Sequence, residues 1–445
     1  MPEDFGLIGM LSIFIAISQS LIDSGMGSGL IQKKNRTDTD FSTVFVFNFI
    51  VSLIIYLILY FSAPLISAFY EIPQLITLTR ILTLNIIINS ISIVQRSKLT
   101  INLDFKTIAK VNIISVFTGG ITGIYFAFKG LGVWALVIQN LSVAFVSVIM
   151  FFILSKWIPS IRFSRESFKN LFGFGSKLLI AGLYAQTIQN IYNITIGKVY
   201  AASELGYYTR SRQFAELTAG TVSSILQQVS YPILASLQDD RKKMSEIFRK
   251  LIRTSSFLIF PSMTLLAILA EPFIQLFLTD KWLPAVPLLQ WLCFARIFYP
   301  INAINMNILN AIGRSDLFLK VDLIKFPVIA TALVITIPLG LKAIVIGHVI
   351  TSIIAFFINA YLPGKYFSYG GFSQLKDMLP GMIATLVMAI VVVIFTHLLD
   401  SLWLKIIIGS ISGFLVYLFV AFLMQINEIK EIRDLIKNSL SGHFN

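Results

Sequence analysis

Residues 171–228 read LFGFGSKLLIAGLYAQTIQNIYNITIGKVYAASELGYYTRSRQFAELTAGTVSSILQQ, and this stretch decides the fold. Its first part is long enough to cross a bilayer as a helix, yet it carries polar side chains spaced i, i+3, i+4 and i+7, which is one helical face. Those side chains are Gln186, Gln189, Asn190 and Asn193. A second stripe in the following helix consists of Thr209, Arg212, Gln213, Glu216, Gly220, Ser223 and Gln227. Two adjacent hydrophobic helices with polar stripes predict a cavity or a bundle interior within a membrane.

The composition of the whole chain agrees with a membrane protein. Of the 445 residues, 56% are hydrophobic and 13% are charged, and the mean hydropathy is +0.82. Apolar stretches of about 20 residues, the length of a membrane-crossing helix, recur along the chain. We therefore expect an all-α polytopic membrane protein, because a membrane β-barrel would show short alternating segments instead.

The net charge is +13, from 35 Lys and Arg against 22 Asp and Glu. The basic residues lie in short loops between apolar spans, where they determine topology. The sequence has no continuous basic patch, so we do not expect nucleic acid as a partner. The single cysteine, Cys293, excludes an intrachain disulfide, and the three histidines lie in separate segments, which argues against a metal site. The acidic start of the chain lacks the basic region of a cleaved signal peptide.

We expect about thirteen spans joined by short connections, with no loop large enough to fold as an extramembrane domain. The approximate bounds are 5–22, 41–63, 75–95, 108–128, 131–155, 173–197, 207–236, 252–278, 285–310, 318–339, 341–362, 378–399 and 403–425. Of the 35 basic residues, 26 follow one set of alternate loops, 8 lie on the opposite side, and Arg296 lies deep in a span. The positive-inside rule therefore places the C-terminus in the cytoplasm.

The spans group into five expected parts. These are an N-terminal helical bundle (1–155), an amphipathic cytoplasmic linker (156–172), a C-terminal helical bundle (173–362), two additional transmembrane helices (363–425) and an amphipathic cytoplasmic tail (426–445). The tail places Ile426, Ile429, Ile432 and Ile436 on one side, which is typical of a helix that lies on a membrane surface.

An internal repeat relates the two bundles. PEDFGL at 2–7 and SELGYY at 203–208 each lead into a helix, but only the second is preceded by one. In the same way, Arg80 in span 75–95 matches Arg296 in span 285–310. A parallel repeat of two six-helix bundles predicts that one N-terminal helix is missing, by truncation or gene-model error, and that the complete protein has about fourteen spans.

Four motifs resemble a known family. PEDFGLIGM (2–10), IDSGMGSGLIQKK (22–34), ELGYYTRSRQ (204–213) and NAIGRSDL (310–317) resemble polysaccharide-export flippases of the multidrug/oligosaccharidyl-lipid/polysaccharide (MOP) superfamily, nearest to its lipopolysaccharide and colanic-acid-type exporters. The resemblance covers essentially the whole chain. It departs at the N-terminus, where members have a helix before the first motif.

The resemblance implies a MATE-like fold of two six-helix bundles around a central cavity, with two additional C-terminal helices and alternating access. The implied substrate is an undecaprenyl-diphosphate-linked oligosaccharide repeat unit, moved across the bacterial inner membrane for lipopolysaccharide, O-antigen or exopolysaccharide biosynthesis. The implied partners are this substrate, the bilayer, and a polysaccharide polymerase with other assembly proteins. No cofactor is implied beyond coupling to a proton or sodium gradient.

Moving a sugar and a diphosphate past hydrocarbon requires cations and hydrogen-bonding side chains. Arg296 is the first candidate, because an Arg roughly 14 Å into a span costs at least about 2.5–3.5 kcal/mol unless it faces water or a partner. The expected substrate-binding residues are Arg296, Arg80, Arg212, Gln186, Gln189, Asn190, Asn193 and Asn307. The expected coupling or gating residues are Glu216 and Asp23.

The charged candidates have structural alternatives. Arg296 can pair with a neighbouring acid, and Arg80 can extend to the membrane interface. Arg212 and Glu216 lie one turn apart and can neutralise each other. Asp23 can serve as a helix-end residue.

The polar stripe at 186–193 can also hold two membrane helices together instead of facing a sugar. The neighbouring aromatic pair, Tyr207 and Tyr208, is expected in a belt at the membrane–water interface.

Two other functions compete with the flippase. A cation-coupled multidrug exporter of the same superfamily predicts more acidic residues in the cavity than the deep charges here provide. A membrane glycosyltransferase or polysaccharide polymerase needs a sizeable outer loop with a catalytic motif, and the longest outer connection, about a dozen residues, carries no carboxylate pair. We therefore expect a transporter without catalytic residues.

Overall fold

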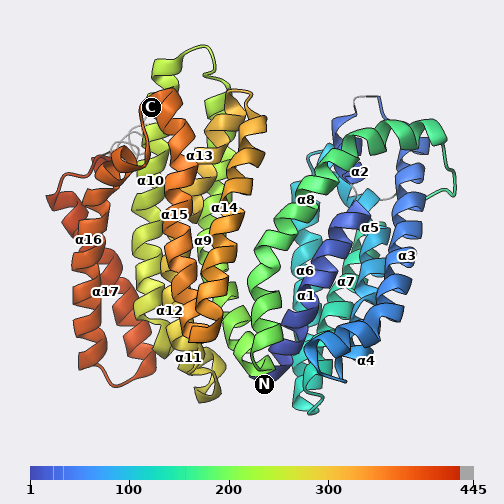
Figure 1. Ribbon diagram of the computed structural model, residues 1–445, viewed down its shortest axis with the longest axis horizontal. Helices are drawn as coiled ribbons and strands as arrows, with labels where there is room; N and C mark the ends of the chain where they lie inside the picture. The colour runs from blue at the N-terminus through green and yellow to red at the C-terminus, as the bar shows by residue number, and fades with distance from the viewer. Residues whose placement is uncertain (24, 34, 156, 431–445) are drawn as a thin grey trace, which may run out of the picture. The chain divides into compact units, whose positions relative to one another are not determined.

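The computed structural model describes residues 1–430 except 24, 34 and 156, and the regular secondary structure of this part is helical (Figure 1). The α-helices are α1 Pro2–Asp23, α2 Met26–Gln32, α3 Asp38–Tyr70, α4 Leu75–Leu82, α5 Leu84–Ile101, α6 Phe105–Phe128, α7 Val133–Ser155, α8 Arg165–Val199, α9 Ala202–Ala235, α10 Arg241–Ile268, α11 Ala270–Leu278, α12 Ala285–Arg296, α13 Tyr299–Ala311, α14 Ser315–Thr336, α15 Leu341–Phe367, α16 Gly371–Leu398 and α17 Leu402–Leu423. Two short 3-10 helices, η1 and η2, span Asp280–Trp282 and Ile337–Leu339.

Ten helical stretches of the described chain are long and apolar enough to cross a membrane. They are Pro2–Ile31, Asp38–Tyr70, Leu75–Ile101, Phe105–Phe128, Val133–Ser155, Arg241–Ile268, Lys320–Leu339, Leu341–Phe367, Gly371–Leu398 and Leu402–Leu423. The protein is therefore a multi-pass membrane protein, as its composition predicted. The other three expected spans, 173–197, 207–236 and 285–310, are helical within α8, α9 and α12–α13, and that they cross the membrane stays a prediction.

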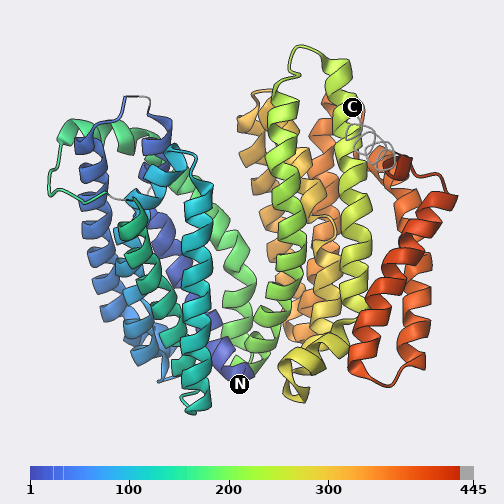
Figure 2. The same cartoon turned by 180° about the vertical axis from the view of Figure 1, so that it is seen from behind.

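The chain forms two compact units, Met1–Gly206 and Tyr207–Asn445. Figures 1 and 2 show α1–α8 in the first unit and α10–α17, with most of α9, in the second. The division differs from the expected one, because the helix at 173–197 was expected to open the second bundle. It lies in the first unit instead, since α8 packs along α1, α2 and α3.

The membrane-facing surfaces follow from where the apolar side chains lie. On α6, Ile113 and Phe117 are each 69% exposed, while Ser115, Gly119 and Gly123 are buried. A Cβ atom at Gly119 would lie 2.2 Å from Cγ2 of Val143 on α7. Large side chains therefore face outward toward lipid, and small ones let the two helices approach closely.

Two expected spans are broken in corresponding places. The span that begins at residue 75 divides at Thr83 into α4 and α5, and the span that begins at residue 285 divides after Arg296 into α12 and α13. Arg80 and Arg296 each lie in the last turn of the first segment, where a positive charge interacts favourably with the helix dipole. The predicted repeat thus recurs as a shared interruption.

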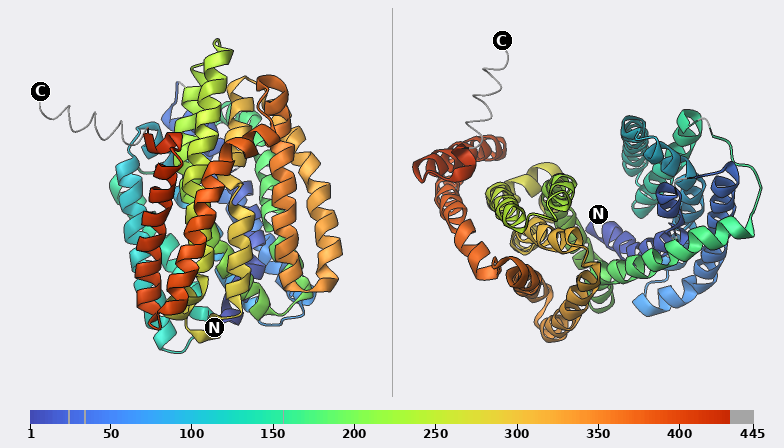
Figure 3. Two further views of the ribbon diagram at one scale, coloured as in Figure 1. Left: turned by 90° about the vertical axis from the view of Figure 1, so that its left-hand side faces the viewer. Right: turned by 90° about the horizontal axis from the view of Figure 1, so that it is seen from above.

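The C-terminal α16–α17 hairpin lies at the edge of the second unit (Figure 3), where the two helices pack on each other and α16 packs on α10. Beyond α17, Ile426 is 8% exposed and packs with Ile429 against Phe257 and Tyr417. This part of the expected tail helix is therefore covered by the protein rather than by a membrane surface. The remaining isoleucines, at 432 and 436, lie outside the described residues.

The expected linker at 156–172 has two parts. Residues 157–164 are not helical, and Ile158 and Ile161 beside Arg162 are 83% and 93% exposed. Helix α8 begins at Arg165 with Ser164 as its N-cap. The exposed apolar and basic side chains fit the expected contact with a membrane surface, which stays a prediction.

Candidate functional site

The structure brings Arg212, Glu216 and Arg296 together in the second unit. Nε of Arg212 lies 2.8 Å from Oε1 of Glu216, and the Arg296 guanidinium pairs with the same carboxylate oxygen. The two arginine side chains are only 12% and 15% exposed, while Glu216 is 41% exposed. Two guanidinium groups therefore share one carboxylate.

The local sequence explains how these side chains meet. Arg212 and Glu216 are four residues apart on α9 and share a helical face. Arg296 is the last residue of α12, and Pro300 at the start of α13 favours a new helix because its backbone has no N–H to donate. The Cζ atom of Arg296 lies 5.5 Å from the ring centroid of Tyr299, a cation–π contact.

Two further residues adjoin this charge cluster. Tyr208 lies one turn before Arg212 and is 0% exposed, so its expected place in an interfacial belt is wrong; the spacing 208, 212, 216 would have identified it as part of the stripe. His348 on α15 is close enough for the charges of Arg296 and Arg212 to act on it. No local pattern marks His348, because α15 meets α12 only in the folded chain, where Ser352 Oγ donates to Ala295 O at 2.6 Å.

Asn307, another expected ligand, does not join the cluster. It lies three turns beyond Arg296 on α13, and its Nδ2 donates to Oγ of the buried Ser230 on α9 at 3.1 Å. This hydrogen bond links α13 to α9.

The polar stripe of α8 lies in the first unit, against α1. Nδ2 of Asn193 donates to Oγ of Ser12 at 3.2 Å, and Nδ2 of Asn190 donates to the Gln186 carbonyl oxygen at 2.9 Å. Asn190 and Asn193 are 9% and 7% exposed, whereas Gln186 is half-buried and Gln189 is exposed. Part of the stripe therefore serves helix contacts, and its glutamines keep accessible surface.

Arg80 and Asp23, also in the first unit, each have a local partner. Nε of Arg80 donates to the Tyr60 carbonyl oxygen at 3.4 Å, and its Cζ lies 4.3 Å from the Tyr60 ring centroid. Asp23 is the exposed last residue of α1 and interacts electrostatically with Arg96.

The two repeated motifs meet in the first unit. A Cβ atom at Gly6 would lie 1.7 Å from the carbonyl oxygen of Ala202, and one at Gly206 would lie 1.9 Å from that of Pro2. Each glycine thus faces the residue four positions before the other glycine. This reciprocal contact of two helix starts requires glycine, because any side chain would overlap backbone.

The described residues contain no group of three or more His, Cys, Asp or Glu side chains that could hold a metal ion. The charge cluster itself offers two guanidinium groups. They can bind an anion with several oxygens once the carboxylate of Glu216 moves aside.

The sequence is similar to proteins of bacterial polysaccharide synthesis. A family model described as "Polysaccharide biosynthesis protein" matches residues 1–287. The teichuronic acid biosynthesis protein TuaB of Bacillus subtilis is 29% identical over 303 residues, which cover 67% of this chain and 62% of that protein. The lipopolysaccharide biosynthesis protein WzxC of Escherichia coli is 23% identical over 363 residues, which cover 81% and 73%. The match thus spans about three fifths to three quarters of these relatives' lengths.

Two solved structures share the fold. The lipid II flippase MurJ in an inward closed conformation matches with a TM-score of 0.74 and 18% identity, covering 98% of each chain. An inward-facing multidrug resistance MATE family transporter of the MOP superfamily matches with a TM-score of 0.66 and 15% identity, covering 83% of this chain and 92% of that one.

Proposed function

Because this chain belongs to the family of polysaccharide biosynthesis proteins, we propose that it is a flippase for lipid-linked oligosaccharides. It moves undecaprenyl-diphosphate-linked repeat units across the bacterial inner membrane by alternating access. The observation that carries the proposal is the charge cluster of Arg212, Glu216 and Arg296, in which two arginines share one carboxylate. A lipid-linked diphosphate needs such a cationic site along its path.

The charge cluster suits a diphosphate for two reasons. Guanidinium groups donate paired hydrogen bonds to phosphate oxygens. In the absence of substrate, Glu216 neutralises part of the charge, so that two arginines can be kept largely buried. In this mechanism the diphosphate displaces the Glu216 carboxylate, which is more exposed than either arginine.

Amide side chains bind the sugar in this proposal. Gln186 and Gln189 retain accessible surface on α8, and amides both donate and accept hydrogen bonds with hydroxyl groups. Asn190, Asn193 and Asn307 already hold neighbouring groups, so they act on the sugar only if these contacts exchange. Arg80 is a second phosphate contact once it leaves Tyr60.

Energy coupling and assembly complete the proposal. Protonation of Glu216 or Asp23 would couple transport to a proton gradient, and a sodium gradient is the alternative driving force. The C-terminus lies in the cytoplasm, and a polysaccharide polymerase receives the product on the opposite side.

The competing multidrug exporter is disfavoured by the same cluster. A site for cationic drugs needs uncompensated negative charge, whereas Arg212 and Arg296 outnumber Glu216. Uptake of a cationic dye by membrane vesicles, driven by a proton or sodium gradient and dependent on this protein, would favour the exporter.

The direct test is the sidedness of the lipid-linked sugar. In a deletion strain we expect undecaprenyl-diphosphate-linked oligosaccharide to accumulate on the cytoplasmic face of the inner membrane. An equal distribution over both leaflets would contradict the proposed function.

The role of the arginines is tested by complementing that strain. Arg296→Gln and Arg212→Gln should lower surface polysaccharide about tenfold or more, because each removes charge-assisted hydrogen bonds to phosphate. Arg241→Gln is the matched control, since Arg241 is an exposed arginine at the start of α10. Immunoblots establish equal protein levels. Normal polysaccharide in both cluster variants would exclude these arginines as essential ligands.

A further inference from the structure

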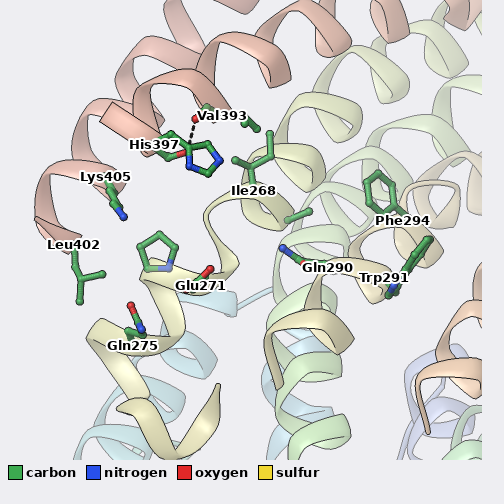
Figure 4. A pocket seen from close by; sticks show the side chains of 13 residues that line it. Ile268, Glu271, Gln275, Gln290, Trp291, Phe294, Val393, His397, Leu402 and Lys405 are labelled. Atoms are coloured by element: carbon green, nitrogen blue, oxygen red, sulfur yellow. Dashed lines mark hydrogen bonds between the residues drawn. The ribbon is translucent and has the colours of Figure 1, made fainter. Parts of the chain in front are cut away.

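A cavity of about 430 Å³ lies within the second unit, between the α16–α17 hairpin and helices α10, α11 and α12 (Figure 4). Its volume is in the range of small-molecule binding sites. Its ionisable and amide side chains are Glu271, Gln275, Gln290, His397 and Lys405. None of them belongs to the charge cluster around Glu216, so the cavity is a separate site.

The polar side chains of the cavity are not used by the protein itself. Within the described part of the chain, none of the five has a side-chain hydrogen bond or an ion pair. The neighbouring Thr396, in contrast, donates to the Val393 carbonyl oxygen at 2.9 Å. Both signs of charge are thus available to a ligand, so this cavity suits a charged ligand.

The lining of the cavity has a polar side and an aromatic side. Glu271 is near the start of α11, and His397 and Lys405 lie at the adjoining ends of α16 and α17, which is where lipid headgroups are found. Trp291 and Phe294 line the cavity from α12, on the side opposite the hairpin (Figure 4). Phe294 is 41% exposed, so an acyl chain can lie along its ring.

We propose that this cavity binds a zwitterionic glycerophospholipid with a primary ammonium group, of the phosphatidylethanolamine class. Lys405 binds the phosphate beside His397, and Glu271 with Gln275 accepts hydrogen bonds from the ammonium group. The glycerol region lies against Trp291, a residue favoured at membrane interfaces, and the acyl chains leave past Phe294.

The two signs of charge select this class of lipid. Figure 4 shows Lys405 and His397 on the hairpin side, with Glu271 and Gln275 on α11 across from them. An anionic lipid such as phosphatidylglycerol would leave the carboxylate of Glu271 without a partner. Phosphatidylcholine has both charges, but its ammonium group has no N–H to donate to carboxylate or amide oxygens.

Native mass spectrometry of the delipidated, purified full chain tests the proposal by titration with each of the three lipids. We expect phosphatidylethanolamine to bind about tenfold more tightly than the other two, and Glu271→Gln and Lys405→Met each to remove about that factor. Glu271→Gln should also shift the preference toward phosphatidylglycerol. Lys405→Arg, which keeps the charge, should retain binding, as should Lys342→Met, a control outside the cavity at the start of α15.

Melting temperatures in lipid-free detergent distinguish lost binding from lost folding. Equal affinity of the wild type for all three lipids would overturn the proposal. So would cavity variants that bind like Lys342→Met. Displacement of the phospholipid by undecaprenyl diphosphate, with tighter binding in Glu271→Gln, would assign the cavity to the transported substrate and also overturn it.

Discussion

At the scale of single residues, Glu216 holds together two arginines that are distant in sequence. Arg212 lies one turn away on the same helix, but Arg296 is 80 residues farther along the chain. Removal of the shared carboxylate leaves two largely buried guanidinium groups without their counterion. Loss of a counterion destabilises the folded protein more when the remaining charges are buried than when they lie on the surface.

We therefore predict that Glu216→Gln lowers the free energy of unfolding by about 1–3 kcal/mol. Because both arginines depend on this carboxylate, Arg296→Gln should cost less in the Glu216→Gln background than in the wild type, with a coupling of about 0.5–3 kcal/mol. Thermal unfolding of the four proteins of this double-mutant cycle measures the coupling. Strictly additive effects would show that the Arg296–Glu216 pair is not formed.

A second prediction at this scale concerns pH and the ion pair between Lys198 and Glu71, whose atoms are 2.9 Å apart. The hydrogen bond and charge of Lys198 hold the pKa of Glu71 below its ordinary value of 4.5. The folded protein therefore binds this proton less readily than the unfolded chain does. The stabilisation is complete above about pH 4.5 and is lost as the pH falls through the lower pKa of the folded state.

Accordingly, wild type and Glu71→Gln should differ most in melting temperature near neutral pH and converge as the pH falls through the lower pKa of the folded state. The difference should be small, because surface ion pairs contribute little. Glu246→Gln is the matched control, since Glu246 is exposed and has no ion pair within the described residues. A difference that stays constant from neutral to acidic pH would rule out the ion pair as its cause.

At the scale of helices, the contact between the starts of α1 and α9 depends on two glycines. A methyl group at Gly6 or Gly206 would lie within 1.9 Å of a backbone oxygen, whereas one at Gly220, also on α9, would meet nothing within 4 Å. In a helix interior alanine is otherwise favoured over glycine by about 0.5–1 kcal/mol. The same substitution should therefore have opposite effects at these positions.

We predict that Gly6→Ala and Gly206→Ala lower the melting temperature, while Gly220→Ala leaves it unchanged or raises it. Differential scanning fluorimetry of the purified variants makes the comparison. If Gly206→Ala is as stable as Gly220→Ala, the two helix starts do not touch as described.

At the scale of the whole molecule, the crossing of α8, α9 and α12–α13 is the open prediction. None of them is among the ten apolar stretches of the described chain, and α12 and α13, with 12 and 13 residues, are each shorter than a membrane-crossing helix. Cys293 is the one cysteine of the chain and is 0% exposed. Because a Cys293→Ser variant has no other cysteine, single introduced cysteines can be assigned to one side of the membrane by labelling in that background.

In that background we expect Ala201→Cys and Asp280→Cys to react with a membrane-impermeant maleimide in intact cells lacking an outer-membrane barrier. Asp239→Cys and Arg314→Cys should react only after the cells are opened. Reaction of neighbouring sites from the same side would show that the helix between them does not cross.

The local features of this protein could be read from its sequence. Long apolar stretches depend only on composition and length, so the all-α membrane class was predicted and is confirmed by the ten helical stretches. The motifs at residues 2–34 and 204–213 indicated a family of polysaccharide synthesis and export, and the family match confirms that the chain belongs to the polysaccharide biosynthesis proteins. The spacing of Arg212 and Glu216 gave their pairing as one of two alternatives, because helix geometry fixes neighbours one turn apart, and the structure shows the pair.

Other features were decided by packing between distant segments. Arg296 had both an acid partner and a substrate as possible neighbours, and the approach of α12 to α9 supplied Glu216. In the same way, α1 supplied Ser12 to Asn193, and packing along α1 to α3 placed α8 in the first unit. The sequence by itself determined which residues share a helical face, because that periodicity is local. Only the tertiary structure decided what each face meets, because contacts between helices depend on the shape and polarity of both partners.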